Sequence, residues 1–432
     1  MNYNDTIDYL YRLQWHGIRF DLEPTARFLE AAGRPQEAYR VLHVGGTNGK
    51  GSTAAMLASM LREAGYSVGL YTSPHLIDFT ERICINGRPI GQDLVVALTE
   101  ELRAVLPPDV DPTFFEFTTV LALLAFARAR VDVAVVEVGM GGRLDATNLV
   151  QPLVSVITNV EADHQRYLGE TIAEIAREKA GIIKAGVPLV TAATRPDALA
   201  VLTERAARLG SRMILVGRDA RTDGASPACF AYHGAGARVP NLSCPLLGRH
   251  QLTNAATALA TIDAARELGL TVDAQAMRRG LARVRWEGRL EVVNTRPSIF
   301  VDGAHNPAGA NVLAEFVREE RARRPGGRLV IVFGILADKD LRGIIERVGA
   351  LADEVVLTEP SYHRAASVDA LRAAASALRI PVRVVPTLAL ALEETESRLA
   401  GDDWCVVTGS LYTVGEVKAI YQGNRQLSVL RG

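Results

Sequence analysis

A glycine-rich stretch, HVGGTNGKGST at residues 43–53, constrains the fold more than any other part of the sequence. It follows a short apolar run, VLHV at 41–44, that is typical of a buried strand, and it precedes a run at 54–65 in which apolar residues recur at helical spacing. A glycine-rich turn between a strand and a helix directs backbone N–H groups and the positive end of the helix toward one point. Lys50 adds a positive charge, and Ser52 or Thr53 offers a hydroxyl for a magnesium ion. The stretch therefore predicts a phosphate-binding loop.

This loop departs from the strict phosphate-loop pattern in its spacing. Gly45 lies too close to Gly49, and Gly51 separates Lys50 from the first hydroxyl. The alternative is a glycine-rich loop that binds no ligand. Because the strand, the helix and the Gly-Lys pair occur together, we favour phosphate binding.

Length and composition limit how many domains the chain can form and which partners it can bind. A chain of 432 residues is too long for one ordinary core and suggests at least two domains. The net charge of −1 predicts no broad positive surface for nucleic acid. No apolar run approaches the roughly 20 residues of a membrane span, and the N-terminus does not resemble a signal peptide. The cysteines form no CxxC pair and are expected to be buried, reduced thiols, which suits a cytoplasmic protein. They are Cys84, Cys229, Cys244 and Cys405.

Strand and helix signals alternate through the first part of the chain. Apolar strand signals occur at 67–73, 131–142 and 152–160, and helix signals at 4–15, 92–106, 115–130 and 171–180. Asn86-Gly87, flanked by alternating apolar residues, predicts a hairpin. The alternation indicates a parallel α/β sheet, in which ligands bind at the carboxyl ends of the strands. The phosphate loop, Ser73, Glu137 and the Asp163-His164 pair all follow strand signals, so we expect them to meet at one edge.

A second pattern of the same kind begins near residues 294–297. Strand-and-turn units recur at 298–307, 328–336, 354–360, 381–387 and 404–410, separated by helical stretches. Before them, 217–247 is irregular and predicts either a small β insertion or an exposed loop, and 250–269 predicts a helix. We therefore expect an α/β protein with a P-loop NTPase-like parallel-sheet domain over 1–295 and a smaller, Rossmann-like α/β domain over 296–432.

Four residues could carry chemistry on the pattern alone. Glu137 ends an apolar strand, where a carboxylate must bond to backbone N–H groups or to a metal; beside a phosphate loop we favour magnesium. His164 follows a strand beside Asp163, although imidazole is an unusual magnesium ligand. Lys179 is interpreted from the pattern as an exposed helix lysine. His305 follows a strand end, where VDGAHNP predicts either a site or only a helix-starting turn.

The sequence resembles the Mur ligase family, in its branch of folylpolyglutamate synthases and dihydrofolate synthases. The runs that match this branch span residues 41 to 418 in order: HVGGTNGKGST, YTSPHLIDFTERICINGRPI, VVEVGMGGRLDATN, ADHQRYLGETIAEIAREKAGIIK, GRHQLTNAATAL, WEGRLEVV, FVDGAHNP and TGSLYTVGEV. The TSPH run with its hairpin separates this branch from the cell-wall Mur ligases.

The resemblance implies an activity and its reactants. Members use ATP to join an amine to a carboxylate through an acyl phosphate, giving ADP and phosphate. It implies L-glutamate as the amine, and dihydropteroate, (tetrahydro)folate polyglutamates or both as the acceptor, in folate biosynthesis and one-carbon metabolism. It also implies two Mg²⁺ ions, ATP held between the domains, and a cytoplasmic monomer without nucleic-acid or membrane partners.

Two alternative functions remain open. One is a ligase for another acid acceptor, such as a cell-wall precursor, against which the TSPH-to-NGRPI stretch argues. The other is a nucleotide-binding switch or transport ATPase, in which DGAHNP and HQLTNAATA have no evident role.

Site residues follow from the resemblance position by position. Contacts to ATP are implied for Gly49, Lys50, Gly51, Ser52, Asn254, Arg289 and Asp302. Magnesium ligands are implied at Ser52 for one ion, and at Ser73, Glu137 and His164 for a second. Catalytic roles are implied for Lys50, His305 and Lys179. Lys179 matches a carbamylated lysine of the family, which contradicts its interpretation from the pattern as an exposed residue. The pterin acceptor is implied, by looser matches, to contact Arg19, Phe20, Asp21, Leu22, Thr113, Phe114, Phe115, Glu116, Leu144, Asp145 and Ala146. The glutamate side would lie in the C-terminal domain.

Overall fold

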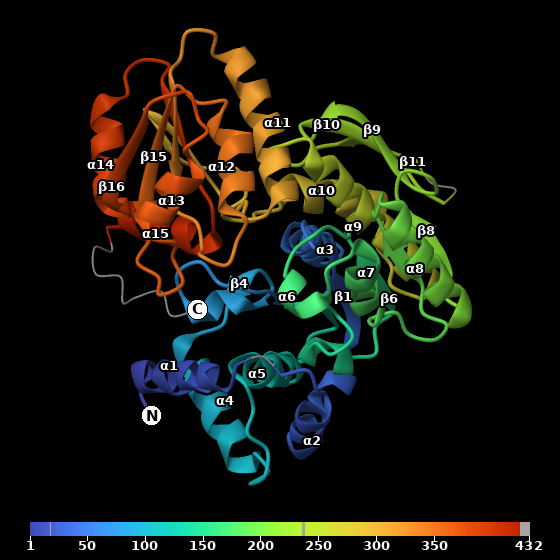
Figure 1. Cartoon of the computed structure of the whole chain (residues 1–432). Coiled ribbons are helices and arrows are strands. Elements are labelled where there is room, and N and C mark those ends of the chain that lie inside the picture. Colours follow the sequence, from blue (N-terminus) through green and yellow to red (C-terminus); the bar gives the residue numbers. More distant parts are fainter. Residues whose placement is uncertain (18, 236–237, 424–432) are drawn as a thin grey trace. The chain divides into compact units, whose positions relative to one another are not determined.

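The computed structural model describes residues 1–17, 19–235 and 238–423, which form two compact units (Figure 1). The first unit comprises Met1–Pro245 and Gln251–Arg285. The second comprises Leu246–His250 and the chain from Trp286 onward. The division falls earlier than the expected join at 295–296, because the strand before that join pairs within the second unit.

A sheet of eight strands forms the centre of the first unit, in the order β4-β3-β2-β5-β1-β6-β7-β8. The strands are β1 (Arg40–Gly45), β2 (Val68–Tyr71), β3 (Ile83–Ile85), β4 (Arg88–Pro89), β5 (Val133–Glu137), β6 (Val154–Ile157), β7 (Leu189–Thr191) and β8 (Met213–Leu215). All neighbours from β2 to β8 in this order are parallel, and β3 and β4 form the antiparallel hairpin at one edge. The predicted parallel α/β sheet and the hairpin at Asn86-Gly87 are therefore confirmed.

Helices connect these strands. They are α1 (Tyr3–Arg12), α2 (Glu23–Ala31), α3 (Lys50–Glu63), α4 (Gln92–Val105), α5 (Phe114–Arg128), α6 (Gln165–Leu168), α7 (Ile172–Ala180), α8 (Pro196–Arg208), α9 (His250–Glu267) and α10 (Ala274–Arg283), with short 3₁₀ turns η1 (Leu13–His16), η2 (Pro35–Glu37), η3 (Phe79–Arg82) and η4 (Ala146–Leu149). The helix expected at 4–15 begins earlier, because the Asn2 side chain accepts the Asp5 N–H and caps it.

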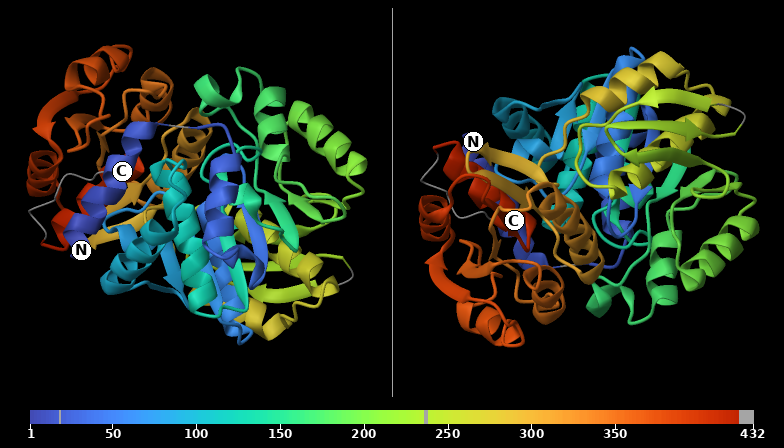
Figure 2. Two further views of the ribbon diagram at one scale, coloured as in Figure 1. Left: turned by 90° about the horizontal axis from the view of Figure 1, so that it is seen from below. Right: turned by 90° about the horizontal axis from the view of Figure 1, so that it is seen from above.

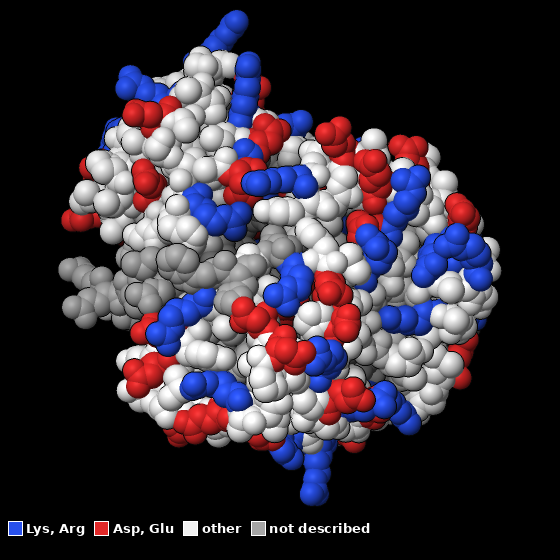
Figure 3. Space-filling view, turned by 60° about the horizontal axis from the view of Figure 1, so that its bottom comes forward, with Lys and Arg blue, Asp and Glu red and all other residues white. Residues whose placement is uncertain are grey.

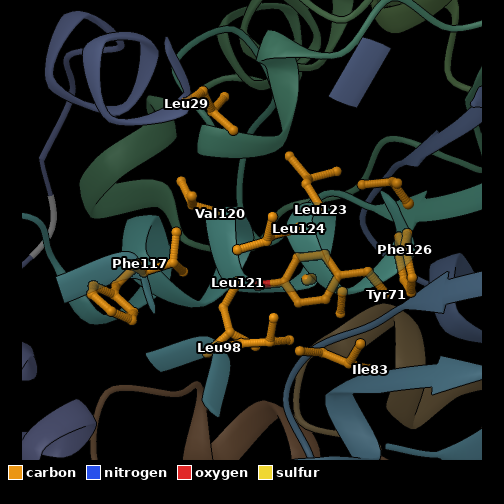
Figure 4. Close-up of a cluster of buried hydrophobic side chains, with 14 of the residues drawn as sticks. Leu29, Tyr71, Ile83, Leu98, Phe117, Val120, Leu121, Leu123, Leu124 and Phe126 are labelled. Carbon is orange, nitrogen blue, oxygen red and sulfur yellow. The ribbon is translucent and has the colours of Figure 1, made fainter. Parts of the chain in front are cut away.

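Helix α5 is the most buried helix of the first core. Phe117, Leu121 and Phe126 have no exposed surface and pack with Tyr71 of β2 and Ile83 of β3 (Figure 4). A side chain at Gly69 of β2 would lie 2.6 Å from the Phe126 ring, so this ring rests directly on the strand backbone. The apolar stretch at 117–130 is therefore a buried helix, as predicted. No helix in the described parts of the chain is long and apolar enough to cross a membrane.

The irregular stretch at 217–247 forms a small antiparallel sheet, which confirms the first of its two predicted alternatives. Its strands are β9 (Arg221–Ser226), β10 (Cys229–His233) and β11 (Arg238–Leu242), in yellow-green in the right-hand view of Figure 2. All four cysteines are free thiols, but Cys229 on β10 is exposed and Cys84 is only partly buried. The expectation that all four would be buried was therefore wrong for these two.

The second unit is built on a six-stranded sheet in the order β12-β13-β17-β14-β15-β16. Its strands are β12 (Glu291–Thr295), β13 (Ser298–Asp302), β14 (Leu329–Phe333), β15 (Glu354–Glu359), β16 (Val382–Thr387) and β17 (Trp404–Thr408). Only β12 is antiparallel to its neighbour. The helices are α11 (Pro307–Arg323), α12 (Leu341–Gly349), α13 (Val368–Ala374), α14 (Leu388–Arg398) and α15 (Leu411–Tyr421). The smaller, Rossmann-like α/β domain is thus confirmed.

Charges of both signs are interspersed on the surface. On the face shown in Figure 3, Lys and Arg side chains alternate with Asp and Glu. This distribution matches the net charge of −1.

Candidate active site

Strand register brings the predicted polar residues of the first unit to one edge of its sheet. Parallel pairing places Val44 of β1 beside Glu137 of β5, and Gly45 beside Ile157 of β6. On the other side of β5, Tyr71 of β2 lies beside Val136. The segments that follow these four strands therefore leave the sheet together, as the alternation predicted.

The phosphate loop is held by the segment that follows β6. The Thr47 N–H donates to the Asn159 carbonyl at 3.0 Å, and the Asn48 N–H donates to Asn159 Oδ1 at 2.8 Å. Thr158 Oγ1 donates to the Asn48 carbonyl at 2.7 Å. These bonds fix the loop in front of α3. Thr158 and Asn159 were not among the predicted site residues, although both lie within the strand signal at 152–160 and directly follow β6.

Lys50 and Ser52 stand at the start of α3. The Lys50 amine donates to the Thr47 carbonyl at 3.2 Å, so it lies back across its own loop. Ser52 is buried, with 3% of its surface exposed. Backbone N–H groups of the first helical turn lack partners within the helix and can bind an anion. The loop thus has the geometry of an anion site.

Asn254 of α9 lies against this loop. Gly49 has φ +82°, and a Cβ placed on it would lie 2.4 Å from Asn254 Oδ1. The Asn254 amide donates to Gln251 Oε1 at 2.9 Å, which fixes its orientation. A residue implied to contact ATP is therefore beside the phosphate loop, although about 200 residues separate the two in the sequence.

Glu137 is buried next to Ser73. It is 4% exposed, and its Oε2 accepts the Ser73 N–H at 3.1 Å. One Glu137 oxygen therefore accepts a backbone N–H, which was the alternative to magnesium binding at this residue. No group of three or more His, Cys, Asp or Glu in the described residues could hold a metal. The Ser73 hydroxyl and the Glu137 carboxylate still offer oxygen ligands that suit Mg²⁺, which usually takes only one or two protein carboxylates, whereas the His164 imidazole is an unusual ligand for it.

His164 lies at the N-terminus of α6. Its φ is +51°, and its side chain is 38% exposed. Its N–H donates to Asp163 Oδ1 at 2.9 Å, and its Nε2 lies 3.9 Å from the same oxygen. The ring therefore stands in solvent beside a carboxylate, where a ligand can reach it.

Lys179 is buried, so its interpretation as an exposed helix lysine was wrong. It is 4% exposed, and its amine donates to the Gly46 carbonyl of the phosphate loop at 3.0 Å. Burial, followed by the charge of Lys50, lowers the pKa of the Lys179 amine from 10.5 to about 7, although Asp163 and Asp145 oppose the shift. The sequence pattern did not predict this burial because α7 is short, and its contact with the phosphate loop determines which of its faces is buried.

Two of the implied acceptor segments meet at Arg19. Its guanidinium donates to the Asp111 carbonyl at 2.9 Å and lies 4.0 Å from Glu116 Oε2. Glu116 and Thr113 cap α5 reciprocally, with the Thr113 N–H donating to Glu116 Oε2 at 2.6 Å and the Glu116 N–H to Thr113 Oγ1 at 3.3 Å. Phe20, in the first segment, is 46% exposed. Asp21 accepts the Glu23 N–H at 3.0 Å at the start of α2.

The remaining acceptor residues differ in their surroundings. The Phe114 ring is buried, stacked on Tyr11 at 5.5 Å with the Arg82 guanidinium 5.1 Å from its centroid. Phe115 packs on the chain after β5, since a Cβ on Gly139 would lie 2.4 Å from its ring. Leu144 is partly buried and Ala146 is buried. Phe114 is thus part of the core, whereas Phe115 rests on the chain that follows β5.

Asp145 is held in a buried hydrogen-bond network. It accepts the Met140 N–H at 2.9 Å and both the N–H and the hydroxyl of Thr147, at 3.0 and 2.5 Å. Since the Thr147 hydroxyl donates to the carboxylate, its oxygen accepts from His43 Nε2 at 2.8 Å. Burial raises the pKa of Asp145 and lowers that of His43 to about 3. The sequence analysis missed His43 and Thr147, which connect β1 to the acceptor loop.

The second unit brings together Arg289, Asp302 and His305. Asp302 is 8% exposed and accepts the N–H groups of Leu290 and Ala304, each at 2.9 Å. Burial raises the pKa of Asp302, and the Arg289 charge opposes the shift. His305 Nδ1 lies 2.8 Å from the Gly303 carbonyl, so this nitrogen carries the hydrogen.

The helix-starting turn at VDGAHNP is also present. Asn306 Oδ1 accepts the Gly309 N–H at 2.8 Å and caps α11. The helix-starting turn is therefore confirmed, and a functional site at this segment stays a prediction.

A cavity of about 280 Å³ lies elsewhere in the first unit, between β8, β10 and α9. Met213, Tyr232 and Asp263 are among the residues that line it. None of the predicted site residues is among them, so the candidate site is separate from this cavity.

Comparison with known proteins identifies the family. The Mur ligase middle domain matches residues 44–262, and the Mur ligase glutamate ligase domain matches residues 288–411. The chain belongs to the Mur ligase family. The first match begins within the phosphate loop and the second includes Arg289, Asp302 and His305.

Individual relatives of this Mur ligase family member specify the branch. Folylpolyglutamate synthase of Lacticaseibacillus casei is 37% identical over 98% of this chain and 100% of its own length. A probable bifunctional folylpolyglutamate synthase/dihydropteroate synthase of Haloferax volcanii is 38% identical over 98% of this chain, which spans only 51% of that relative. The structure of Escherichia coli FolC in complex with DHPP and ADP has a TM-score of 0.90 at 31% identity, with 99% of each chain covered. The branch inferred from the ordered motifs is thereby confirmed.

The contact between Asn254 and the phosphate loop predicts a difference between two glycine substitutions. Gly49 and Gly65 both have positive φ, but only at Gly49 would a Cβ meet a neighbour within 4 Å. We expect Gly65→Ala to lower the free energy of unfolding by about 1–2 kcal/mol, and Gly49→Ala by a further ~1–3 kcal/mol. Urea denaturation measures both. Equal losses, or no recovery when Asn254→Ala is added to Gly49→Ala, would contradict the contact.

Burial of Lys179 predicts a pH-dependent stability of the unmodified protein. Its pKa is about 7 in the folded chain and near 10.5 when unfolded, so between these values the unfolded chain binds the extra proton. The free energy of unfolding should therefore rise as pH increases through this window, relative to Lys179→Met. Denaturation of both proteins in CO₂-free buffers measures the difference. A difference that does not change with pH would refute the lowered pKa.

Proposed function

We propose that this chain is an ATP-dependent amide ligase that joins L-glutamate to a pterin acid, with ADP and phosphate as the other products. The acceptor is dihydropteroate, a (tetrahydro)folate polyglutamate, or both. The observation that carries the proposal is the gathering of the phosphate loop, buried Glu137 and buried Lys179 at one sheet edge. This gathering occurs in a chain that matches a folylpolyglutamate synthase over that protein's whole length.

The reaction proceeds in two bond exchanges. An acceptor carboxylate oxygen forms a bond to the γ-phosphorus of ATP, the bond from that phosphorus to the β-phosphate oxygen breaks, and ADP leaves. The glutamate amine then attacks the acyl carbon, the bond to phosphate breaks, and the amine loses a proton. Phosphoryl transfer requires positioning and neutralisation of charge more than covalent help.

The first unit supplies that positioning. Backbone N–H groups of Gly49, Gly51 and Ser52 and the ammonium of Lys50 bind the phosphates, and Asn254 contacts the nucleotide. Ser52, and separately Ser73, Glu137 and His164, would hold two Mg²⁺ ions, which neutralise phosphate charge when bound. By the resemblance, Arg289 and Asp302 would also contact ATP, and His305 would act on the incoming glutamate.

Lys179 acts as a carbamate in this proposal. A neutral amine adds to CO₂, forming an N–C bond and releasing one proton, and the product is anionic. An ordinary lysine is neutral in only about one molecule in a few thousand at pH 7, whereas a pKa of about 7 leaves Lys179 neutral in about half. Its burial against the phosphate loop therefore supports carbamylation, and the added carboxylate-like group would help to bind magnesium.

The acceptor's pterin ring binds to the three segments around Arg19–Leu22, Thr113–Glu116 and Leu144–Ala146. Support comes from the contact of Arg19 with Glu116 and from the position of Phe115 over Gly139. We further propose that the enzyme acts as a cytoplasmic monomer in folate metabolism, without nucleic-acid or membrane partners.

Parallel ligase assays test the function. Purified protein receives ATP, Mg²⁺ and glutamate with either dihydropteroate or tetrahydrofolate, and ADP release should require both glutamate and one of the acceptors. Absence of ADP with both acceptors would refute the proposal. ADP release without glutamate or acceptor would favour a switch or transport ATPase, and ligation only to a cell-wall precursor would place the activity in another branch.

The carbamate role predicts chemical rescue. Lys179→Ala should lower kcat by at least about 100-fold, because it removes a group beside the transferring phosphate. Added acetate or formate should restore part of the activity by supplying the missing carboxylate. Lys184→Ala is the matched control, since that amine donates to the Asn148 carbonyl at 2.7 Å instead of to the phosphate loop. Full activity of Lys179→Ala would refute the role.

A further inference from the structure

Two exposed aromatic side chains face each other beside the candidate site. The ring centroids of Phe20 and Tyr167 are 6.2 Å apart, and their planes are inclined by 43°. Phe20 is 46% exposed and Tyr167 is 40% exposed. Single exposed apolar residues are ordinary on protein surfaces. A pair of exposed aromatic rings next to the segments implied for the acceptor is a stronger indication of a ligand.

Tyr167 belongs to α6, which contacts the acceptor segments from several sides. Its own ring meets Phe20 of the first segment. The next residue, Leu168, packs on Gly141, where a Cβ would lie 2.9 Å from Leu168 Cδ2. Gly141 belongs to the same loop as Gly139, on which Phe115 of the second segment rests, and this loop continues into Leu144–Ala146. Helix α6 therefore contacts the first segment and the loop that leads into the third, on which Phe115 of the second segment also rests.

The spacing of the two rings suits a flat ligand. A planar ring in contact with a ring on each side needs about 7–8 Å between the two, because each contact is about 3.5–4.0 Å. The two ring centroids are 6.2 Å apart and the planes are inclined, so a planar ring can enter between them after a small outward movement of these two exposed side chains. The Arg166 guanidinium lies 5.7 Å from the Tyr167 centroid, where it can favour one ring orientation.

We propose that Tyr167 and Phe20 clamp the bicyclic ring of the acceptor, which makes Tyr167 a specificity-determining residue. The sequence analysis assigned no role to Tyr167. The inference rests on the proposed function, since it takes the acceptor to be a pterin. In this proposal, recognition of the pterin ring depends on aromatic stacking by α6, the helix that begins immediately after His164.

Substitution of Tyr167 combined with a shortened acceptor tests the clamp. Tyr167→Leu keeps an apolar side chain but removes the ring, and should raise the KM for tetrahydrofolate or dihydropteroate by roughly 5- to 100-fold. Tyr167→Phe should retain nearly the wild-type KM, because stacking does not need the hydroxyl. The KM values for ATP and glutamate should stay unchanged in both variants. With p-aminobenzoylglutamate, which lacks the pterin ring, wild type and Tyr167→Leu should have equal kcat/KM.

A control variant separates stacking from general surface effects. Leu268→Ala removes a side chain that is 44% exposed. Its neighbour Gly269 accepts a hydrogen bond from Arg40, at the start of β1 and so at the opposite edge of the sheet. This variant should match wild type with every acceptor.

The outcomes separate the clamp from the proposed function. A wild-type KM in Tyr167→Leu, or an equal loss with the shortened acceptor, overturns the clamp while ligation itself stands. Wild-type protein that releases no ADP with any of these acceptors overturns the proposed function, and with it the inference.

Discussion

Hydrogen bonding between the parallel strands β5, β1 and β6 fixes the geometry on which the site depends. Their register sets Glu137 beside the strand that leads into the phosphate loop, and sets Thr158 and Asn159 behind that loop. Parallel strands end at the same edge, so a polar residue placed after any of them is delivered to the same place.

Burial of charge at this edge carries a free-energy cost that the structure offsets in different ways. Glu137 and Asp145 are buried carboxylates that accept backbone N–H groups, which stabilise the ionised form. The buried Lys179 amine donates to a backbone carbonyl, and burial lowers its pKa to about 7. Lys179 is therefore available as a neutral nucleophile. Burial thus makes one lysine chemically different from all ordinary surface lysines.

Polar networks below the site connect its parts. His43, Thr147 and Asp145 form a buried chain from β1 to the loop that carries Leu144 and Ala146. Because burial lowers the pKa of His43 to about 3, its ring stays neutral at neutral pH. Thr158 and Asn159 provide the corresponding support for the phosphate loop. Partners of this kind hold contacting residues in place and lower the entropy cost of binding.

Local sequence determined much of this protein. The phosphate loop, the strand and helix alternation, the hairpin at Asn86-Gly87 and the restart after residue 297 depend on short-range patterns, and each is present in the structure. The ends of helices did not follow from the sequence pattern in the same way. Asn2 caps α1, so this helix begins before the expected residue 4. The ordered motifs also identified the family, because they extend over nearly the whole chain.

Tertiary structure alone decided which residues meet. It buried Lys179 against Gly46, placed Asn254 on Gly49, set Phe20 opposite Tyr167 and left Cys229 exposed. These outcomes depend on contacts between segments far apart in the sequence, and the periodicity of one segment carries no information about its partner. A lysine on a helix has the same local pattern whether its helix faces solvent or another loop. Only the packing of α7 on the phosphate loop distinguishes the two.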